Sequence, residues 1–217
     1  MISRRRALAL FSMGAVGSLS GCIGFLTGSE ALKFSAETAT VASASLDETG
    51  YEKAPDSSGE QTVERSFSVA DQERQVEVTN HIQEYKRKVD LGLLGEQELA
   101  RFIVLSTPKV DIAGKTFNPV GEWSAKEFVM QIQSAYKGLS DIQQEGERSV
   151  SMLGESRTVT KFSARAEVAN GEKVDVYIHV TEAVGDGDDY VVGIGVYPQQ
   201  IDGEQARVDE LIAGIEH

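Results

Sequence analysis

The sequence predicts an α+β fold, a mainly antiparallel sheet of about seven strands with helices packed on it, in one domain over residues 36–217 behind an N-terminal signal segment. Three observations lead to this prediction. Most of the chain consists of segments in which apolar and polar residues alternate, which is typical of strands with one buried face. Short turn sequences such as Asn170-Gly171 separate them, and hairpin-length connections favour antiparallel neighbours. Two other segments repeat apolar residues at helical spacing.

The first half of the domain is expected to contribute one short helix and three strands. Thr40 and Gly50 bound a helix over residues 41–49, with Thr40 as its cap. Alternating residues then predict a hairpin over roughly residues 61–83. The continuous apolar run at residues 101–105 predicts a strand inside the sheet.

The sharpest local pattern of the domain begins a helix over residues 125–138. Ser124 and Glu127 have the spacing of a capping box, in which each side chain bonds a free backbone N–H at the other position. Trp123 and Phe128 occupy the two positions of a hydrophobic staple. This helix is therefore predicted from its start.

Four more strands and a second helix complete the predicted domain. The strands turn at Gly154, at Asn170-Gly171 and at residues 185–189. Gly193 and Gly195 alternate within the last strand, which predicts that another element packs closely over that face. A helix over residues 203–214 carries an apolar stripe.

The first 22 residues have the order of an export signal that ends at a lipid-attachment cysteine. Arg4 and Arg5 form the positive start and resemble a twin-arginine motif, and the apolar stretch that follows is too short to span a bilayer. Cleavage between Gly21 and Cys22 would leave Cys22 as the lipidated N-terminus, followed by a tether over residues 22–35. An ordinary N-terminal helix with a chance cysteine, or a cleaved signal without lipid, are the alternatives.

The charge of the chain excludes some partners. The sequence has 34 Asp and Glu against 21 Lys and Arg, a net charge of −13, and residues 4–6 of the expected signal supply three of the basic side chains. Nucleic-acid binding and electrostatic docking on anionic headgroups both need a basic surface, so neither is expected. The carboxylates are scattered, which favours adaptation to high salt over an acidic functional face.

Candidate chemistry in the domain is sparse. Asp186, Asp188 and Asp189 could bind a hard cation, but the strand pattern resumes too soon for a calcium loop, so a solvated hairpin tip is the preferred interpretation. No metal and no cofactor are expected. Asp175, Tyr177 and His179 would share one strand face.

These three residues form the candidate surface site. The competing interpretation makes His179 an ordinary sheet histidine whose hydrogen bonds are satisfied within the fold.

Short motifs spread over nearly the whole chain together resemble one protein family. They comprise Leu46, Thr49-Gly50-Tyr51, Glu77-Val78-Thr79-Asn80, Tyr85, Leu105-Ser106-Thr107-Pro108, Phe117-Asn118-Pro119-Val120-Gly121 and Val174-Asp175-Val176-Tyr177-Ile178-His179-Val180. This set resembles an uncharacterised family of haloarchaeal lipoproteins exported by the twin-arginine route. The resemblance implies a hypersaline archaeal source and attachment to the outer face of the cell membrane, and it implies no activity. The order of elements is also similar to the Mog1/PsbP-type α/β/α sandwich, whose members are mostly accessory and binding proteins.

The sequence therefore predicts a membrane-anchored extracytoplasmic lipoprotein that serves as a non-enzymatic binding or accessory module of the cell envelope. Its expected partners are the membrane, through a lipid on Cys22, and another envelope protein. A surface hydrolase that uses His179 with Asp175 or a nearby serine is the alternative. A solute-binding lipoprotein of a transporter is less favoured, because such proteins usually need two α/β lobes.

Overall fold

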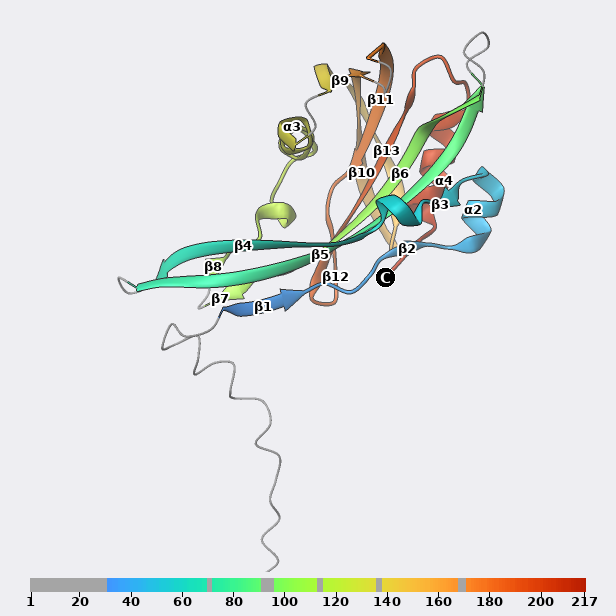
Figure 1. Ribbon diagram of the computed structural model, residues 1–217. Helices are drawn as coiled ribbons and strands as arrows, with labels where there is room; N and C mark the ends of the chain where they lie inside the picture. The colour runs from blue at the N-terminus through green and yellow to red at the C-terminus, as the bar shows by residue number, and fades with distance from the viewer. Residues whose placement is uncertain (1–30, 70–71, 91–95, 113–114, 136–137, 168–170) are drawn as a thin grey trace, which may run out of the picture.

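A ten-stranded mixed sheet dominates the fold (Figure 1). The computed structural model describes residues 31–69, 72–90, 96–112, 115–135, 138–167 and 171–217. The main path of the sheet runs, in spatial order, through β1 (Leu32–Ser35), β5 (Gln72–Asp90), β6 (Glu96–Pro108), β13 (Asp189–Pro198), β11 (Lys173–Thr181), β10 (Glu155–Glu167) and β9 (Leu139–Met152). Off this path, β3 (Glu52–Lys53) and β4 (Gly59–Val69) pair with β5, and β12 (Val184–Asp186) pairs with β13. Two small sheets join β2 (Thr40–Val41) to β14 (Ile215–Glu216) and β7 (Asp111–Ile112) to β8 (Lys115–Thr116).

The seven predicted strands correspond to β4, β5, β6, β9, β10, β11 and β13. Among the strand pairs that the structure describes, β1 with β5 is parallel and the others are antiparallel. The α+β class and the mainly antiparallel sheet are therefore confirmed. β1 and β12 were not predicted, because three or four residues are too few to show an alternating pattern.

Helices lie on both faces of the sheet. Figure 1 shows α3 (Ala125–Ala135) on one side, and α2 (Ser43–Thr49) and α4 (Glu204–Ala213) on the other. Short 3₁₀ turns, η1 (Pro55–Ser57) and η3 (Pro119–Gly121), complete the helical elements of the described residues. The helix predicted at 41–49 begins later than expected, because Thr40 belongs to β2 and Ala42 occupies the N-cap position.

The capping box of α3 is confirmed. The Ser124 backbone N–H donates to Glu127 Oε2 at 2.8 Å, and the Glu127 N–H donates to Ser124 Oγ at 3.2 Å. Trp123 and Phe128 form the staple, with ring centroids 5.9 Å apart in an edge-to-face arrangement. These bonds satisfy free N–H groups at the start of the helix.

Each face of the sheet carries its own core. Val208, Leu211 and Ile212 of α4 pack on one face, and Phe128 and Val129 of α3 pack on the other. The two faces follow the alternation of side chains along β13 and its neighbours.

The prediction from the glycines of β13 is confirmed. A Cβ atom added to Gly195 would lie 2.8 Å from both methyl carbons of Val208 in α4, closer than such atoms approach. At Gly193, an added Cβ atom would lie 3.2 Å from Ile215 Cδ1. Glycine in β13 therefore lets α4 and the segment after it approach the sheet.

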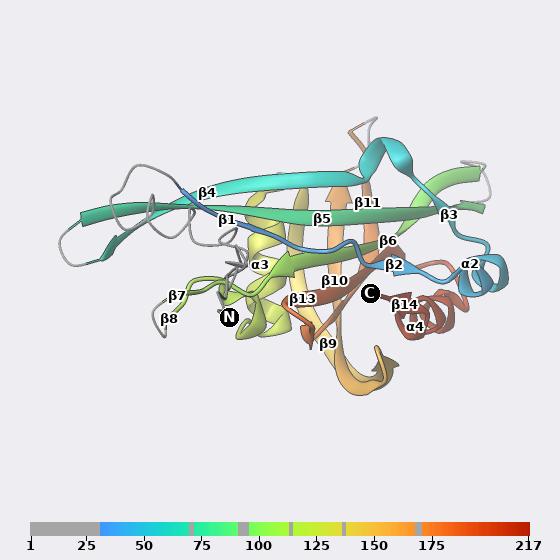
Figure 2. The same cartoon turned by 90° about the horizontal axis from the view of Figure 1, so that it is seen from below.

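The hairpin of β4 and β5 extends beyond the rest of the domain as a long arm (Figures 1 and 2). β1 lies beside the arm and runs parallel to β5, with Leu32 opposite Val76 and Ser35 opposite Thr79. Residues 32–35, which the sequence assigned to the tether, thus belong to the main sheet.

The predicted signal residues Arg4, Arg5, Gly21 and Cys22 lie outside the residues that the structure describes. Across the described part of the chain, none of the helices has both the length and the apolar character needed to cross a bilayer.

Candidate functional site

His179, one of the three residues of the predicted surface site, is fully buried, with an exposed fraction of 0 %. Its Nδ1 lies 2.8 Å from Arg148 Nη1, and its Nε2 lies 2.9 Å from Tyr197 Oη. Arginine can only donate, so Nδ1 accepts and the imidazole proton sits on Nε2, from which it is donated to Tyr197. The Tyr197 ring also stacks on the imidazole, with centroids 5.3 Å apart.

Burial and the neighbouring cations keep this histidine neutral. Burial first, and then the positive charges of Arg148 and Lys161, lower the pKa of His179 to about 3. Arg148 is itself held by Asp209 of α4 through its Nε, 2.8 Å from Oδ1. The cluster therefore links β9, β11, β13 and α4, and His179 is a satisfied sheet histidine rather than part of a surface.

Asp175 and Tyr177 lie on the same strand face as His179 and line an open depression of about 490 Å³. Asp175 pairs with Arg165, whose Nε is 3.2 Å from Oδ1. The ammonium of Lys161 sits 3.5 Å from the centre of the Tyr177 ring. Because both ring nitrogens of His179 are engaged and Asp175 pairs with Arg165, these two residues do not form the His–Asp pair that the hydrolase alternative uses.

The aspartates of the last hairpin are not a solvated tip throughout, which corrects the prediction. Asp189 is 4 % exposed, and its Oδ2 accepts from the Glu37 backbone N–H at 2.7 Å. His217 lies between two carboxylates, 2.9 Å from Asp186 and 3.1 Å from Asp189. In the part of the chain that the structure describes, no group of three or more His, Cys, Asp or Glu side chains is arranged to hold a metal ion.

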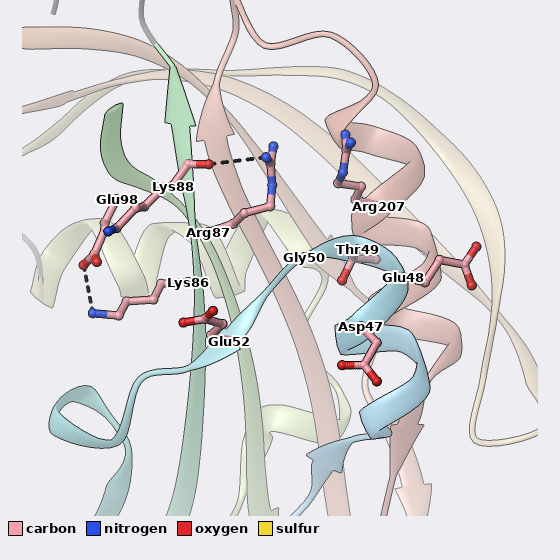
Figure 3. A pocket seen from close by; sticks show the side chains of 10 residues that line it. All are labelled: Asp47, Glu48, Thr49, Gly50, Glu52, Lys86, Arg87, Lys88, Glu98 and Arg207. Atoms are coloured by element: carbon pink, nitrogen blue, oxygen red, sulfur yellow. Dashed lines mark hydrogen bonds and ion pairs between the residues drawn. The ribbon is translucent and has the colours of Figure 1, made fainter. Parts of the chain in front are cut away.

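A second depression, of about 510 Å³, lies between α2, α4 and the far end of β5. We call it the α2–α4 cavity. Its lining comes from residues 47–50 at the end of α2, Glu52 of β3, residues 86–88 of β5, Glu98 of β6 and Arg207 of α4 (Figure 3). Gly50 ends α2 in the left-handed conformation, with φ of 72°, and turns the chain from the helix toward β3.

A buried carboxylate holds Arg87, one of the residues that line this cavity. Glu204, the first residue of α4, has an exposed fraction of 0 %. Its Oε1 accepts from Tyr51 Oη at 2.7 Å and from Arg87 Nε at 3.3 Å, and Arg87 Nη2 bonds its Oε2. Burial, and then the charge of Glu204, raise the pKa of Tyr51, so that its hydroxyl stays a donor. Arg87 also donates from Nη1 to the Lys88 carbonyl at 3.3 Å and is thereby fixed on three sides.

Some of the basic side chains around the cavity have ion-pair partners and others have none. Lys86 pairs with Glu98 at 2.8 Å. Arg207 Nη1 lies 3.6 Å from Glu204, which is an ion pair outside hydrogen-bond distance, and its side chain is 40 % exposed. Among the described residues, the Lys88 ammonium has no ion pair.

Two acidic side chains of the lining are unpaired. Within the described part of the chain, the carboxylates of Asp47 and Glu52 have neither an ion pair nor a hydrogen bond. In Figure 3 they lie on the α2 and β3 side, away from the guanidinium groups of Arg87 and Arg207.

The sequence patterns do not predict this cavity. Residues 86–88 are the only run of three basic residues after the expected signal. In so acidic a chain, this run could have indicated a charged site on the surface. Glu204 gave none, because an acidic residue in the first turn of a helix is ordinarily exposed and favoured there by the helix dipole.

A family model described as a domain of unknown function, DUF6517, matches residues 38–216. The chain belongs to this family. The matched DUF6517 region contains both the α2–α4 cavity and the His179 cluster, and it begins after β1. Comparison with curated proteins gives no match.

Proposed function

We propose that this chain is a membrane-anchored extracytoplasmic lipoprotein, and that its domain is a non-enzymatic binding or accessory module of the cell envelope. The order of basic residues, apolar stretch, small residues and cysteine in residues 1–22 supports the anchor. Two lipid chains on Cys22 would hold the protein stably at the membrane, since each buried methylene contributes about 0.8 kcal/mol.

The observation that carries the binding role is the position of the α2–α4 cavity relative to the tether. The chain enters the domain at Leu32, opposite Val76 of β5, and the cavity is lined by residues 86–88 of the same strand. At about 3.3 Å per residue, about 35 Å of strand separates these two levels. A domain that is anchored next to β1 and has its cavity at the far end of β5 exposes that cavity to components away from the lipid surface.

Three finer proposals follow the sequence patterns. The route of export is the twin-arginine pathway, which carries folded proteins, and it suits a domain whose helices and hairpins form without disulfides. The source is a haloarchaeon, because scattered carboxylates keep a protein soluble at high salt. The two helical faces around the sheet favour a sandwich of the Mog1/PsbP type.

The anchor is tested by Cys22→Ser in the native host. The variant should be released into the medium or left unprocessed, and processed variant that stays in the membrane would contradict lipidation. For export, Arg4→Lys with Arg5→Lys should leave precursor in the cytoplasm, whereas Arg6→Lys is the matched control and should be exported.

The binding role is tested by a pull-down from cross-linked membranes. Wild-type protein should recover an envelope component. Recovery of no component, together with turnover of a substrate by the purified protein, would refute the non-enzymatic role.

A further inference from the structure

β1 is held to the domain by weak interactions. It has four residues, and among the described strands it pairs only with β5, in the parallel arrangement, which is slightly less stable per residue than the antiparallel one. Leu32 and Phe34 are only half-buried, and the residues that alternate with them are exposed. The ion pair of Lys33 with Glu77 joins side chains that are 73 % and 27 % exposed, so it adds little to stability.

The chain is held firmly directly after β1. Ala36 is buried, and the Glu37 backbone N–H donates to the buried Asp189 carboxylate at 2.7 Å. The Ser106 hydroxyl donates to the Glu37 carbonyl. A little further along, Val41 belongs to the core beneath α4. Weak and firm attachment therefore meet at residues 36–37, where the chain before this point can separate from the domain.

The rest of the sheet does not depend on β1. β6 pairs with β5 from His81 to Asp90, whereas β1 pairs with the same edge of β5 from Val76 to Thr79, which β6 leaves free. Loss of β1 therefore keeps the pairing of β5 with β4 and β6. The DUF6517 match agrees, because it begins at residue 38 and leaves β1 outside the region that defines the family.

We infer that β1 is a detachable strap, which separates from β5 up to residue 36 while the rest of the domain stays folded, and that its release lengthens the membrane tether. The lengthening rests on the proposed anchor at Cys22, but the opening of β1 does not. Val76, directly opposite Leu32, is 2 % exposed, and the cost of uncovering it keeps the open state a minority.

The seated and released states differ in how far the domain can stand from the lipid. With β1 seated, residues 22–31 join the lipid to the domain and reach at most about 33 Å. With β1 released, residues 22–35 do so and reach at most about 46 Å. The seated strap also makes the tether leave the domain beside the arm of β4 and β5 (Figure 2).

Hydrogen exchange of the full-length chain, read by mass spectrometry at urea concentrations below the unfolding transition, tests the opening. Residues 32–36 should be protected at least about 100-fold less than residues 101–106 of β6, and their exchange should hardly depend on urea, because a local opening exposes little surface. Equal protection of the two segments, with the same dependence on urea, would overturn the strap.

Variants separate the strap from the folded domain. Leu32→Ser combined with Phe34→Ser should abolish the protection of residues 32–36. The urea midpoint, followed by the fluorescence of Trp123, the only tryptophan, should then shift by less than about a quarter of the shift that Val41→Ser causes. Val41→Ser is the control, since Val41 lies in the core after residues 36–37. Equal shifts would show that β1 unfolds only with the domain and would refute the inference.

The lengthening is tested on vesicles. Cys22 is the only cysteine, so the full-length chain can be coupled through it to a maleimide lipid, with no dependence on lipidation in the host. Anionic vesicles repel a chain of net charge −13 and keep the tether extended. At one fixed salt concentration, energy transfer from Trp123 to a dansyl lipid should be lower in the double variant than in wild type.

Unchanged energy transfer would overturn the lengthening of the tether. Because the coupling to Cys22 is chemical, this result is independent of the Cys22→Ser experiment in the host. The strap can therefore fail while the lipid anchor stands, and the anchor can fail while the strap stands.

Discussion

Replacing Gly195 with alanine should destabilise the domain, because the added methyl group has no space between β13 and α4. The new Cβ atom would lie 2.8 Å from both methyl carbons of Val208, a side chain that is itself fully buried. Neither β13 nor α4 can move freely, because each is part of the same core. Overpacking of this kind costs about 1–3 kcal/mol.

Gly146→Ala is the matched control. Gly146 also lies within a strand, β9, and an added Cβ atom there would have no atom within 4 Å. Both variants gain about 0.5–1 kcal/mol from the lower entropy of the unfolded chain. The two should therefore differ by the overpacking cost alone, which corresponds to about 2–4 °C in Tm for each kcal/mol in a chain of this length.

Urea denaturation of both variants, with wild type, measures this difference. Val208→Ala in the Gly195→Ala background should relieve the contact, so that the double variant is more stable than the sum of the single changes by about 1 kcal/mol or more. If Gly195→Ala proves as stable as Gly146→Ala, or if the double variant recovers nothing, the close approach of α4 to β13 is not what glycine serves here.

Two further predictions concern buried charge. Arg87→Met leaves the Glu204 carboxylate buried without its main partner and should lower the free energy of unfolding by about 3–5 kcal/mol. The control variant Lys86→Met breaks the exposed pair with Glu98 and should lower the free energy of unfolding by less than about 1 kcal/mol. Equal losses for the two variants in urea denaturation would contradict the role of the buried pair. The unfolded chain protonates His179 near pH 6.5, but burial holds the folded pKa at about 3, so the unfolded state binds more protons between these values and stability falls as the pH falls. His179→Phe should remove about 2 kcal/mol of the stability change between pH 6.5 and pH 4.5, and an unchanged pH dependence in the variant would refute the neutral buried histidine.

Local patterns in the sequence predicted the elements that depend on neighbouring residues. Ser124 and Glu127 specified the start of α3, because a capping box acts within three residues. Gly50 marked the end of α2 for the same reason. The polar sequence of β9 gave a shorter predicted strand than the structure has, because β9 is an edge strand that is mostly exposed and shows little alternation.

Patterns of burial were only partly predictable. Strict alternation placed Asp175, Tyr177 and His179 on one strand face, and the structure agrees. It could not say how far α4 covers that face, so His179 is buried beneath the helix while Asp175 and Tyr177 line an open depression. Asp189 was assigned to a solvated turn because its burial comes from the distant Glu37 and His217.

By itself, the sequence determined the α+β class, the capped helix and the close packing over Gly195, since each depends on side chains a few residues apart or on a fixed period along one element. The signal around Cys22 stays a prediction. Only the tertiary structure decided that Arg87 and Arg207 share the buried Glu204, and that their cavity lies far along β5 from the strand through which the chain enters. Arg87 and Glu204 are more than a hundred positions apart in the sequence. The order of strands in the sheet and the face on which α4 packs bring them together. Periodicity specifies which face of an element is apolar, but the free energy of burying that face is realised only against a partner that the whole chain supplies.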